Sequence, residues 1–257
     1  MTILKRNPSN VATVILAAGE GRRMQSALPK VMHELSRKPL IEYVVKAAED
    51  SGVAGSLVVV ASATGQAVQD YLGERVSYVV QSQQLGTGHA VAATEDFFKE
   101  QSDEIESMVV LYGDMPFISP QSIKRLTGEH IAKRNVLTVM TATVPNFEGT
   151  NSQFKDFGRI VRNSRGEIEK IVEYKDASVA EKNIGEVNTG FFCFDAPWLW
   201  SHLKLIRNSN DQGEYYLTDL VGLAIQGGYP ISTVLVEVSE AIGVNTKEQL
   251  ERLHVIN

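Results

Sequence analysis

The feature that most constrains the fold is an apolar run that ends in a glycine-rich, basic loop. The run VATVILAA covers residues 11–18, and the strings GEGRRM (19–24) and LPK (28–30) follow it. Such a run predicts a buried strand. Glycines directly after a strand let the backbone turn its N–H groups toward an anion, and two arginines and Lys30 add positive charge. The loop therefore predicts a binding site for a phosphorylated ligand.

This loop differs from two common phosphate-binding motifs. A Walker loop requires Gly, four residues, Gly, and then Lys with Ser or Thr, and no such string occurs in the chain. The dinucleotide fingerprint requires a third Gly or Ala where this chain has Met24. An ordinary turn with solvated arginines remains the alternative. Pro29 favours the phosphate interpretation, because it fixes the backbone beside Lys30.

Length, charge and cysteine content limit the remaining classes. The 257 residues, 43% of them hydrophobic, suffice for one large α/β domain or two small ones. A net charge of −6 argues against nucleic acid as a partner. The single cysteine, Cys193, lies in an apolar run and predicts a buried thiol.

The N-terminus carries no convincing targeting signal. The first apolar run has eight residues, lacks an Ala-x-Ala ending and leads directly into the basic loop. No apolar stretch approaches the ~20 residues of a membrane helix. We therefore expect a cytoplasmic protein that makes no membrane contact, with a flexible tail at residues 1–10.

Strand and helix signals alternate through the first half of the chain. Strands are predicted at residues 11–18, 56–61, 75–80 and 108–112. Helices are predicted at residues 39–49, 64–72 and 88–98. Apolar strands separated by helices predict an α/β fold with a Rossmann-like, mostly parallel sheet covered by helices.

The second half contains more strands in succession. Strands are predicted at residues 136–143, 158–162, 167–173, 187–195 and 231–238. Helices are predicted at residues 196–207, 214–226 and 247–255. The strands at 158–162 and 167–173 flank a turn and predict a hairpin. We expect one domain, 11–257, with a nucleotide-binding half at 11–134 and a mixed, partly antiparallel substrate half at 135–257.

Polar clusters follow three of the predicted strands. They lie at residues 19–30, 81–89 and 112–116, and ligands of parallel sheets bind at the carboxyl ends of strands. Asp114 is suited to Mg²⁺ held largely by substrate phosphates, although a turn aspartate is the alternative. Gln81 and Gln84 carry amides that can read a nucleobase edge, and Gly86 permits close backbone approach.

An ordered series of motifs resembles the sugar-phosphate nucleotidyltransferases. The series consists of LAAGEGRRM (16–24), LPK (28–30), QLGTGH (84–89), YGDMP (112–116), FGR (157–159), EYKD (173–176), NTG (188–190), QGEYYLTD (212–219) and GVN (243–245). It extends from about Val11 to the C-terminus. Within the family, the nearest resemblance is to the N-acetylglucosamine-1-phosphate uridyltransferase domain of the bifunctional bacterial enzyme.

The resemblance implies a reaction and its participants. The chain would transfer the uridylyl group of UTP to N-acetylglucosamine 1-phosphate, giving pyrophosphate and UDP-N-acetylglucosamine, a precursor of peptidoglycan and lipopolysaccharide in cell wall biogenesis. Mg²⁺ would be the cofactor. An oxygen of the sugar phosphate would attack the α-phosphate in line, so no protein nucleophile is expected. None of the five histidines is expected to be catalytic, and His89 is expected to be structural.

The same resemblance implies a role for each matched residue. Arg23 and Lys30 would neutralise the triphosphate during catalysis, and Asp114 and Asn245 would hold Mg²⁺. The nucleotide-binding residues would be Leu16, Ala18, Gly19, Gln81, Gly86 and Thr87. Gly158, Glu173 and Asn188 would bind the sugar. Taken singly, the sugar-binding positions and Asn245 also fit turn, cap or solvated-strand roles.

Some features depart from the family pattern. Arg22 stands where Thr is usual, Phe157 where Tyr is common, and Tyr174 where His is common. The bifunctional enzyme continues into a hexapeptide-repeat acetyltransferase, and we expect no such segment up to Asn257. We therefore expect either an excised domain or a stand-alone uridyltransferase. The alternative functions are another nucleotidyltransferase, using dTTP, GTP or CTP, and a noncatalytic nucleotide sensor. Asp114 with Asn245 argues against the sensor, and a homo-oligomer is left open.

Overall fold

The computed structural model describes residues 10–19, 21–101 and 105–256, so nearly all of the tail predicted at 1–10 lies outside the described residues. The main sheet consists of β1 (Val11–Ala17), β4 (Ser56–Ser62), β5 (Ser77–Gln81), β6 (Ser107–Tyr112), β7 (Leu137–Thr143), β8 (Arg159–Arg162), β9 (Ile168–Val172), β10 (Glu186–Asp195) and β11 (Ile231–Leu235). Two short strands, β2 (Glu34–Leu35) and β3 (Lys38–Pro39), pair separately.

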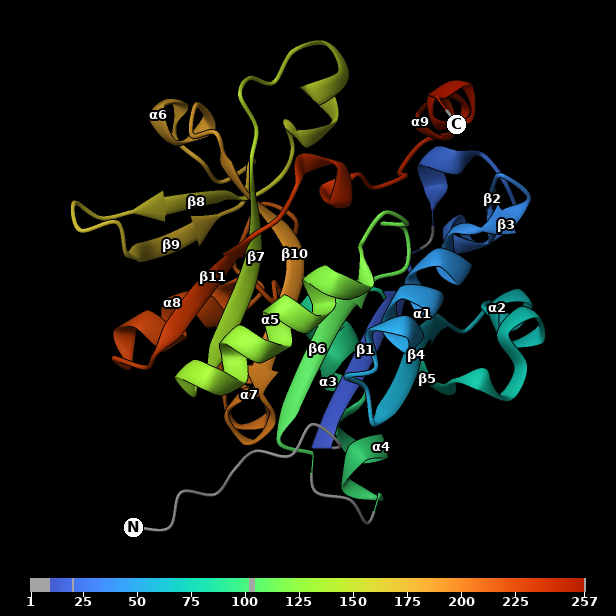
Figure 1. Cartoon of the computed structure of the whole chain (residues 1–257), viewed down its shortest axis with the longest axis horizontal. Coiled ribbons are helices and arrows are strands. Elements are labelled where there is room, and N and C mark those ends of the chain that lie inside the picture. Colours follow the sequence, from blue (N-terminus) through green and yellow to red (C-terminus); the bar gives the residue numbers. More distant parts are fainter. Residues whose placement is uncertain (1–9, 20, 102–104, 257) are drawn as a thin grey trace.

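The main sheet runs through the whole domain in the order β11-β7-β10-β6-β1-β4-β5, with β8 and β9 extending from β10 (Figure 1). β1 pairs in parallel with both β4 and β6, and β11 pairs in parallel with β7. β10 is antiparallel to β6 and β7. The predicted mostly parallel α/β sheet, with a partly antiparallel second half, is confirmed.

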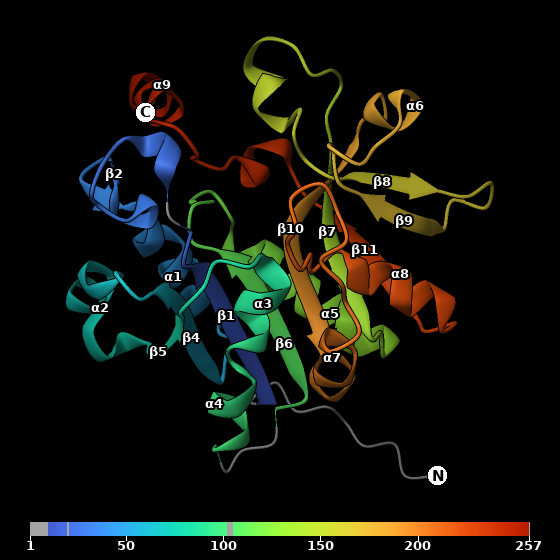
Figure 2. The same ribbon diagram turned by 180° about the vertical axis from the view of Figure 1, so that it is seen from behind.

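Helices cover both faces of this sheet. They are α1 (Leu40–Ser51), α2 (Gln66–Leu72), α3 (Thr87–Ala92), α4 (Glu95–Lys99), α5 (Pro120–Lys133), α6 (Val179–Lys182), α7 (Ala196–Leu203), α8 (Asp219–Gln226) and α9 (Lys247–Ile256). α1 and α5 lie in front of the sheet in Figure 1, while α3 and α7 come to the front in Figure 2. Alternate residues of β1 enter different cores: Ile15 packs on the α1 side and Val14 on the α3 side. This double burial explains why the strand is apolar throughout.

Several predicted helices have different boundaries in the structure, and for two of them a contact explains the difference. The helix predicted at 88–98 is divided into α3 and α4, where the hydroxyl of Thr94 donates to the carbonyl of Val91 at 2.7 Å. The helix predicted at 214–226 begins only at Asp219. The backbone of Tyr215 instead bonds to the segment at 85–88, so it is not free to start the helix.

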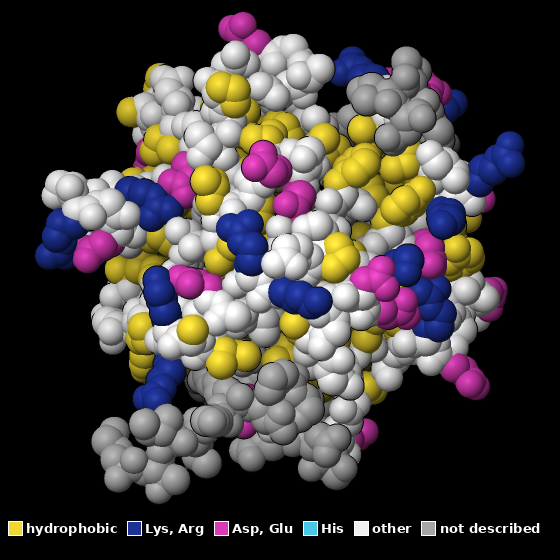
Figure 3. All heavy atoms as spheres, viewed as in Figure 1, with side chains coloured by type: hydrophobic (Ala, Val, Ile, Leu, Met, Phe, Trp, Pro, Cys, Tyr) yellow, Lys and Arg dark blue, Asp and Glu magenta, His cyan; other side chains and the backbone are white. Residues whose placement is uncertain are grey.

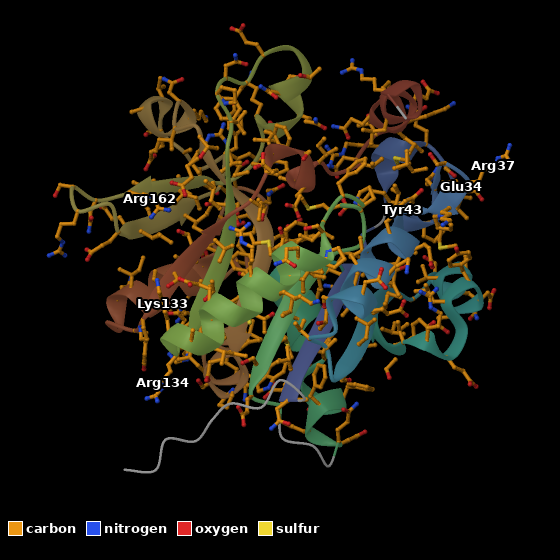
Figure 4. All side chains as sticks on the ribbon, in the orientation of Figure 1. Glu34, Arg37, Tyr43, Lys133, Arg134 and Arg162 are labelled. Carbon is orange, nitrogen blue, oxygen red and sulfur yellow. The ribbon has the colours of Figure 1, made fainter. Side chains whose placement is uncertain are left out.

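α5 was not predicted, although its start carries a clear signal. Pro120 is the first helical residue, and the hydroxyl of Ser119 accepts from the N–H of Ser122 at 3.1 Å. α5 ends at Lys133, and Arg134 is its C-cap; both residues are labelled in Figure 4. No helix among the described residues is long and apolar enough to cross a membrane.

An arginine adds side-chain contacts between the β8–β9 hairpin and the rest of the sheet. Arg162, labelled in Figure 4, pairs with both carboxylate oxygens of Glu186 on β10 at 2.7 and 2.6 Å. Its guanidinium also donates to the hydroxyl of Thr233 on β11 at 3.1 Å.

On the face seen in Figure 3, Lys and Arg side chains lie interspersed with Asp and Glu side chains.

A bulge interrupts β10 beside the carboxyl end of β6. The register between β10 and β7 shifts between Asn188 and Phe192. Gly190 in this bulge has a φ of +84°, and a Cβ there would lie 2.5 Å from the ring of Tyr112. The bulge therefore depends on a residue without a side chain.

We expect Gly190→Ala to destabilise the fold by about 1–3 kcal/mol, because it combines a positive φ with overlap on the Tyr112 ring. Gly222→Ala in α8 is the matched control: its added methyl meets no atom within 4 Å. That control should be neutral or more stable, as helical alanine is. Urea denaturation of both variants measures the difference, and equal midpoints would contradict the proposed overlap.

Candidate functional site

Two adjoining cavities lie at the carboxyl ends of the central strands. Cavity A, of about 420 Å³, is lined by ten of the predicted residues: Leu16, Ala18, Gly19, Arg23, Lys30, Gln81, Gly86, Thr87, Asp114 and Asn245. Cavity B, of about 280 Å³, is lined by the predicted sugar-binding residues Gly158, Glu173 and Asn188. Thr87, Asp114 and Asn245 line both cavities. The structure thus brings every predicted site residue to one continuous cleft.

Lys30 lines cavity A and contacts two residues of the junction between the cavities. Its ammonium forms an ion pair with the carboxylate of Asp114 and donates to Oδ1 of Asn245 at 3.0 Å. Only 16% and 13% of the Lys30 and Asp114 side chains are exposed, so water screens the pair weakly. Gly21 allows the basic loop to pack against the base of the Lys30 side chain, since a Cβ at Gly21 would lie 2.8 Å from Cβ of Lys30. The guanidinium of Arg23 lies 3.4 Å from the same Asn245 oxygen.

The oxygen pair of Asp114 and Asn245 is suited to a hard cation. One carboxylate and one amide oxygen already face the Lys30 ammonium, a positive group in contact with both. Within the described residues, no group of three or more His, Cys, Asp or Glu side chains is arranged to hold a metal. A two-oxygen set fits Mg²⁺ that takes its other ligands from water and substrate phosphates.

The far wall of cavity A is a backbone clasp between residues 85–88 and the segment before α8. The N–H of Gly88 donates to the carbonyl of Tyr215, and the N–H of Tyr215 donates to the carbonyl of Leu85, both at 2.8 Å. Gly86 has a φ of +104°, and a Cβ there would lie 2.7 Å from the Tyr215 oxygen. Only glycine permits this contact.

Glu173 lies in a crowded acidic part of cavity B. Its carboxylate accepts from the hydroxyl of Thr218 at 2.9 Å. Burial raises the pKa of the Glu173 carboxyl; the Thr218 hydrogen bond opposes this rise, and the nearby carboxylates of Asp176 and Asp219 add to it. Gly158 leaves room beside it, because a Cβ there would lie 3.4 Å from both carboxylate oxygens.

Asn188 is held by the bulge in β10. Its Oδ1 accepts from the N–H of Gly190 at 2.9 Å, and its own N–H donates to the carbonyl of Gly158 at 2.8 Å. Phe157, one of the residues that depart from the family pattern, also lines cavity B. The side chain of Arg22, another departure, lies outside what the structure describes.

Two residues that line both cavities were not predicted as site residues. Tyr112 lies at the end of β6, where burial and the nearby Glu173 carboxylate raise the pKa of its hydroxyl. Glu214 precedes the clasp at Tyr215. Both fall inside quoted motifs, YGDMP and QGEYYLTD, so those motifs carried a signal for them.

Comparisons with known proteins identify a family and relatives of the chain. Residues 13–167 match the family of MobA-like NTP transferase domains. The bifunctional protein GlmU of Acetivibrio thermocellus is 40% identical over 92% of this chain and 49% of its own length. GlmU of Shouchella clausii is 42% identical over 93% of this chain and 50% of its own length. The chain therefore spans about half the length of these curated relatives.

Solved structures show the same fold at low sequence identity. A structure described as a putative glucose-1-phosphate thymidylyltransferase from Bacillus anthracis, in complex with a sucrose, aligns with a TM-score of 0.74 at 21% identity, covering 96% of this chain and 94% of that one. A UDP-glucose pyrophosphorylase complexed with UDP-glucose aligns with a TM-score of 0.73 at 19% identity, covering 95% and 97%.

We expect Glu173→Gln to stabilise the protein at pH 7. A raised carboxyl pKa means that the folded state disfavours the charged form, so the penalty is present at neutral pH and disappears as pH falls through the folded pKa. Removing it should raise Tm by roughly 2–4 °C, the shift that about 1 kcal/mol produces in a chain of this size. The gain should shrink toward acidic pH.

Glu181→Gln provides a control of opposite sign. Lys170 and Ser178 lower the pKa of Glu181 to about 2, so its charged form stabilises the folded state above its ordinary pKa. This variant should lose stability at pH 7. Thermal denaturation of both variants at several pH values makes the comparison, and a lower Tm for Glu173→Gln at pH 7 would contradict the assigned penalty.

Proposed function

Because the chain belongs to the family of MobA-like NTP transferase domains, we propose that it transfers the uridylyl group of UTP to N-acetylglucosamine 1-phosphate. The products are UDP-N-acetylglucosamine and pyrophosphate. The observation that carries the proposal is the junction of cavities A and B at Asp114 and Asn245. A nucleotide in cavity A and a sugar phosphate in cavity B would meet there through their phosphates.

Lys30 and Arg23 supply positive charge on the nucleotide side of this junction. Both line cavity A, where the triphosphate would lie. An oxygen of the sugar phosphate forms a bond to the α-phosphorus of UTP, and the bond between that phosphorus and the bridging oxygen to the β-phosphate breaks. The electron pair leaves with pyrophosphate. The two cations stabilise the charge on the phosphoryl oxygens and on the leaving group.

Asp114 and Asn245 are the residues that would hold Mg²⁺. When bound, the ion would neutralise phosphate charge and orient the α-phosphate toward the sugar phosphate. The ion pair between Lys30 and Asp114 keeps the carboxylate neutralised in the ligand-free protein. Substrate phosphates compete for the same ammonium, so Lys30 is able to exchange one anionic partner for another.

Gly158, Glu173 and Asn188 would recognise the sugar. The Glu173 carboxylate accepts hydrogen bonds from sugar hydroxyl groups, and the side-chain NH₂ of Asn188 is available to donate, since its oxygen accepts from Gly190. Gly158 keeps space open next to Glu173. These groups orient the sugar so that its phosphate points toward the junction.

A pyrophosphate-release assay tests the proposal directly. The purified protein is supplied with Mg²⁺, one of UTP, dTTP, CTP or GTP, and either N-acetylglucosamine 1-phosphate or glucose 1-phosphate. We expect the highest kcat/KM with UTP and the acetylated sugar phosphate. Preference for another nucleotide would replace the proposal with a different nucleotidyl transfer, and binding without turnover would identify a nucleotide sensor.

Asp114→Asn should reduce turnover by at least roughly 100-fold, the scale of losing one electrostatic group at a reacting centre. The variant keeps the size of the side chain but loses the carboxylate that neutralises Lys30 and would hold Mg²⁺. Asp50→Asn, which changes an exposed ion pair with Lys46, is the matched control and should keep full activity. Wild-type turnover by folded Asp114→Asn would remove Asp114 from the proposed metal pair.

A further inference from the structure

Two neighbours determine which end of the Gln81 amide faces cavity A. Nε2 of Gln81 lies 3.2 Å from the carbonyl oxygen of Gly86 and 2.9 Å from Nδ1 of His89. A backbone carbonyl oxygen can only accept a hydrogen bond, so the amide atom facing it must be the NH₂ nitrogen. The assignment of the Gln81 amide therefore follows from the chemistry of Gly86.

The same geometry determines the protonation of the His89 ring. Nδ1 of His89 lies 2.9 Å from the same Gln81 nitrogen, so with the NH₂ group as the donor that ring nitrogen accepts. The ring proton of His89 then lies on Nε2. A proton on Nδ1 would place two donors face to face and would favour turning the amide around.

Both partners of Gln81 lie at the start of α3: Gly86 is its N-cap, and His89 is in its first turn. The Gly86 carbonyl also accepts from the N–H of Ala90 at 3.1 Å, which fixes its direction as part of the helix. His89 lies on the same turn and is half-buried. Gln81 itself, at the end of β5, is 4% exposed, so water competes little for these bonds. The amide is held rigidly by two acceptors three residues apart.

This arrangement leaves Oε1 as the amide atom available to a ligand in cavity A. No hydrogen bond from a described residue reaches that oxygen. An acceptor at this position matches the ring N–H of uracil, whereas cytosine presents a lone pair at the equivalent ring nitrogen. Two acceptors facing each other leave both unsatisfied, which disfavours cytosine.

We infer that His89 is a positioning residue for base selection: its unprotonated Nδ1 holds the Gln81 amide with the oxygen toward the nucleobase, so that uracil is preferred to cytosine. The inference rests on the proposed function for the identity of the nucleotide. It gives His89 a role beyond helix packing. His89 contacts Gln81, and Gln81 would contact the base.

Kinetics with UTP and CTP test this role. His89→Phe retains an aromatic ring but removes the acceptor, and the ratio of kcat/KM for UTP to that for CTP should fall by about three- to tenfold, the range for one lost hydrogen bond. The change should appear mainly in KM for UTP, since the base contact is the same in the bound substrate and the transition state. His89→Asn, which returns an acceptor near the position of Nδ1, should restore most of the ratio.

Two further variants separate positioning from packing. His202→Phe, the same change in α7 outside both cavities, should leave the UTP to CTP ratio unaltered. In a Gln81→Ala background, His89→Phe should cause no further loss of the ratio, because the amide that it positions is absent. If His89→Phe slows UTP and CTP turnover equally, the inference is wrong.

A spectroscopic measurement tests the same inference without turnover. A long-range ¹H–¹⁵N correlation spectrum of the ligand-free protein, with His89 assigned by comparison with His89→Asn, should show a neutral ring protonated on Nε2. A proton on Nδ1 would overturn the inference even if UTP is the preferred substrate. Conversely, the expected tautomer together with no UTP turnover would count against the proposed function and not against the amide geometry.

Discussion

The contact of the Lys30 ammonium with Asp114 and Asn245 is the interaction on which the site depends. It joins positions 84 and 215 residues apart in the chain, so the basic loop after β1, the end of β6 and the segment before α9 meet at one point. Separately, Lys30 and Asp114 would each be a partly buried charge without an opposite charge beside it. Together they keep anion-binding and cation-binding groups close to each other, as the proposed phosphoryl transfer requires.

Close approaches of the backbone complete the two cavities. Gly86 lies against the carbonyl of Tyr215, and Gly190 lies against the ring of Tyr112. Both glycines have a positive φ, and both meet atoms that cannot move without disturbing a strand or a loop. The cleft is therefore shaped as much by missing side chains as by the polar groups that line it.

The acidic cluster around Glu173 shows a conflict between stability and function. Burial and neighbouring carboxylates raise the pKa of Glu173, so its charged form is disfavoured in the folded protein. In the proposed function, the same carboxylate nevertheless accepts hydrogen bonds from sugar hydroxyl groups. In the Arg162–Glu186 pair, by contrast, the hydrogen bonds to Glu186 raise the pKa of Arg162 and outweigh the opposing effect of burial.

The sequence by itself determined the alternation of strands and helices, the order of the motifs and the residue types at the strand ends, because hydrophobic periodicity and turn residues act locally. It did not predict α5, despite the Ser119–Pro120 signal, and it began α8 at 214 instead of Asp219. The late start was decided by the clasp between Tyr215 and Leu85, a contact between segments 130 residues apart in the sequence. The pairing of Lys30 with Asp114, the raised pKa of Glu173 and the orientation of the Gln81 amide were likewise decided only by tertiary structure. Each depends on which distant groups share a partly dehydrated space, and no local pattern encodes that.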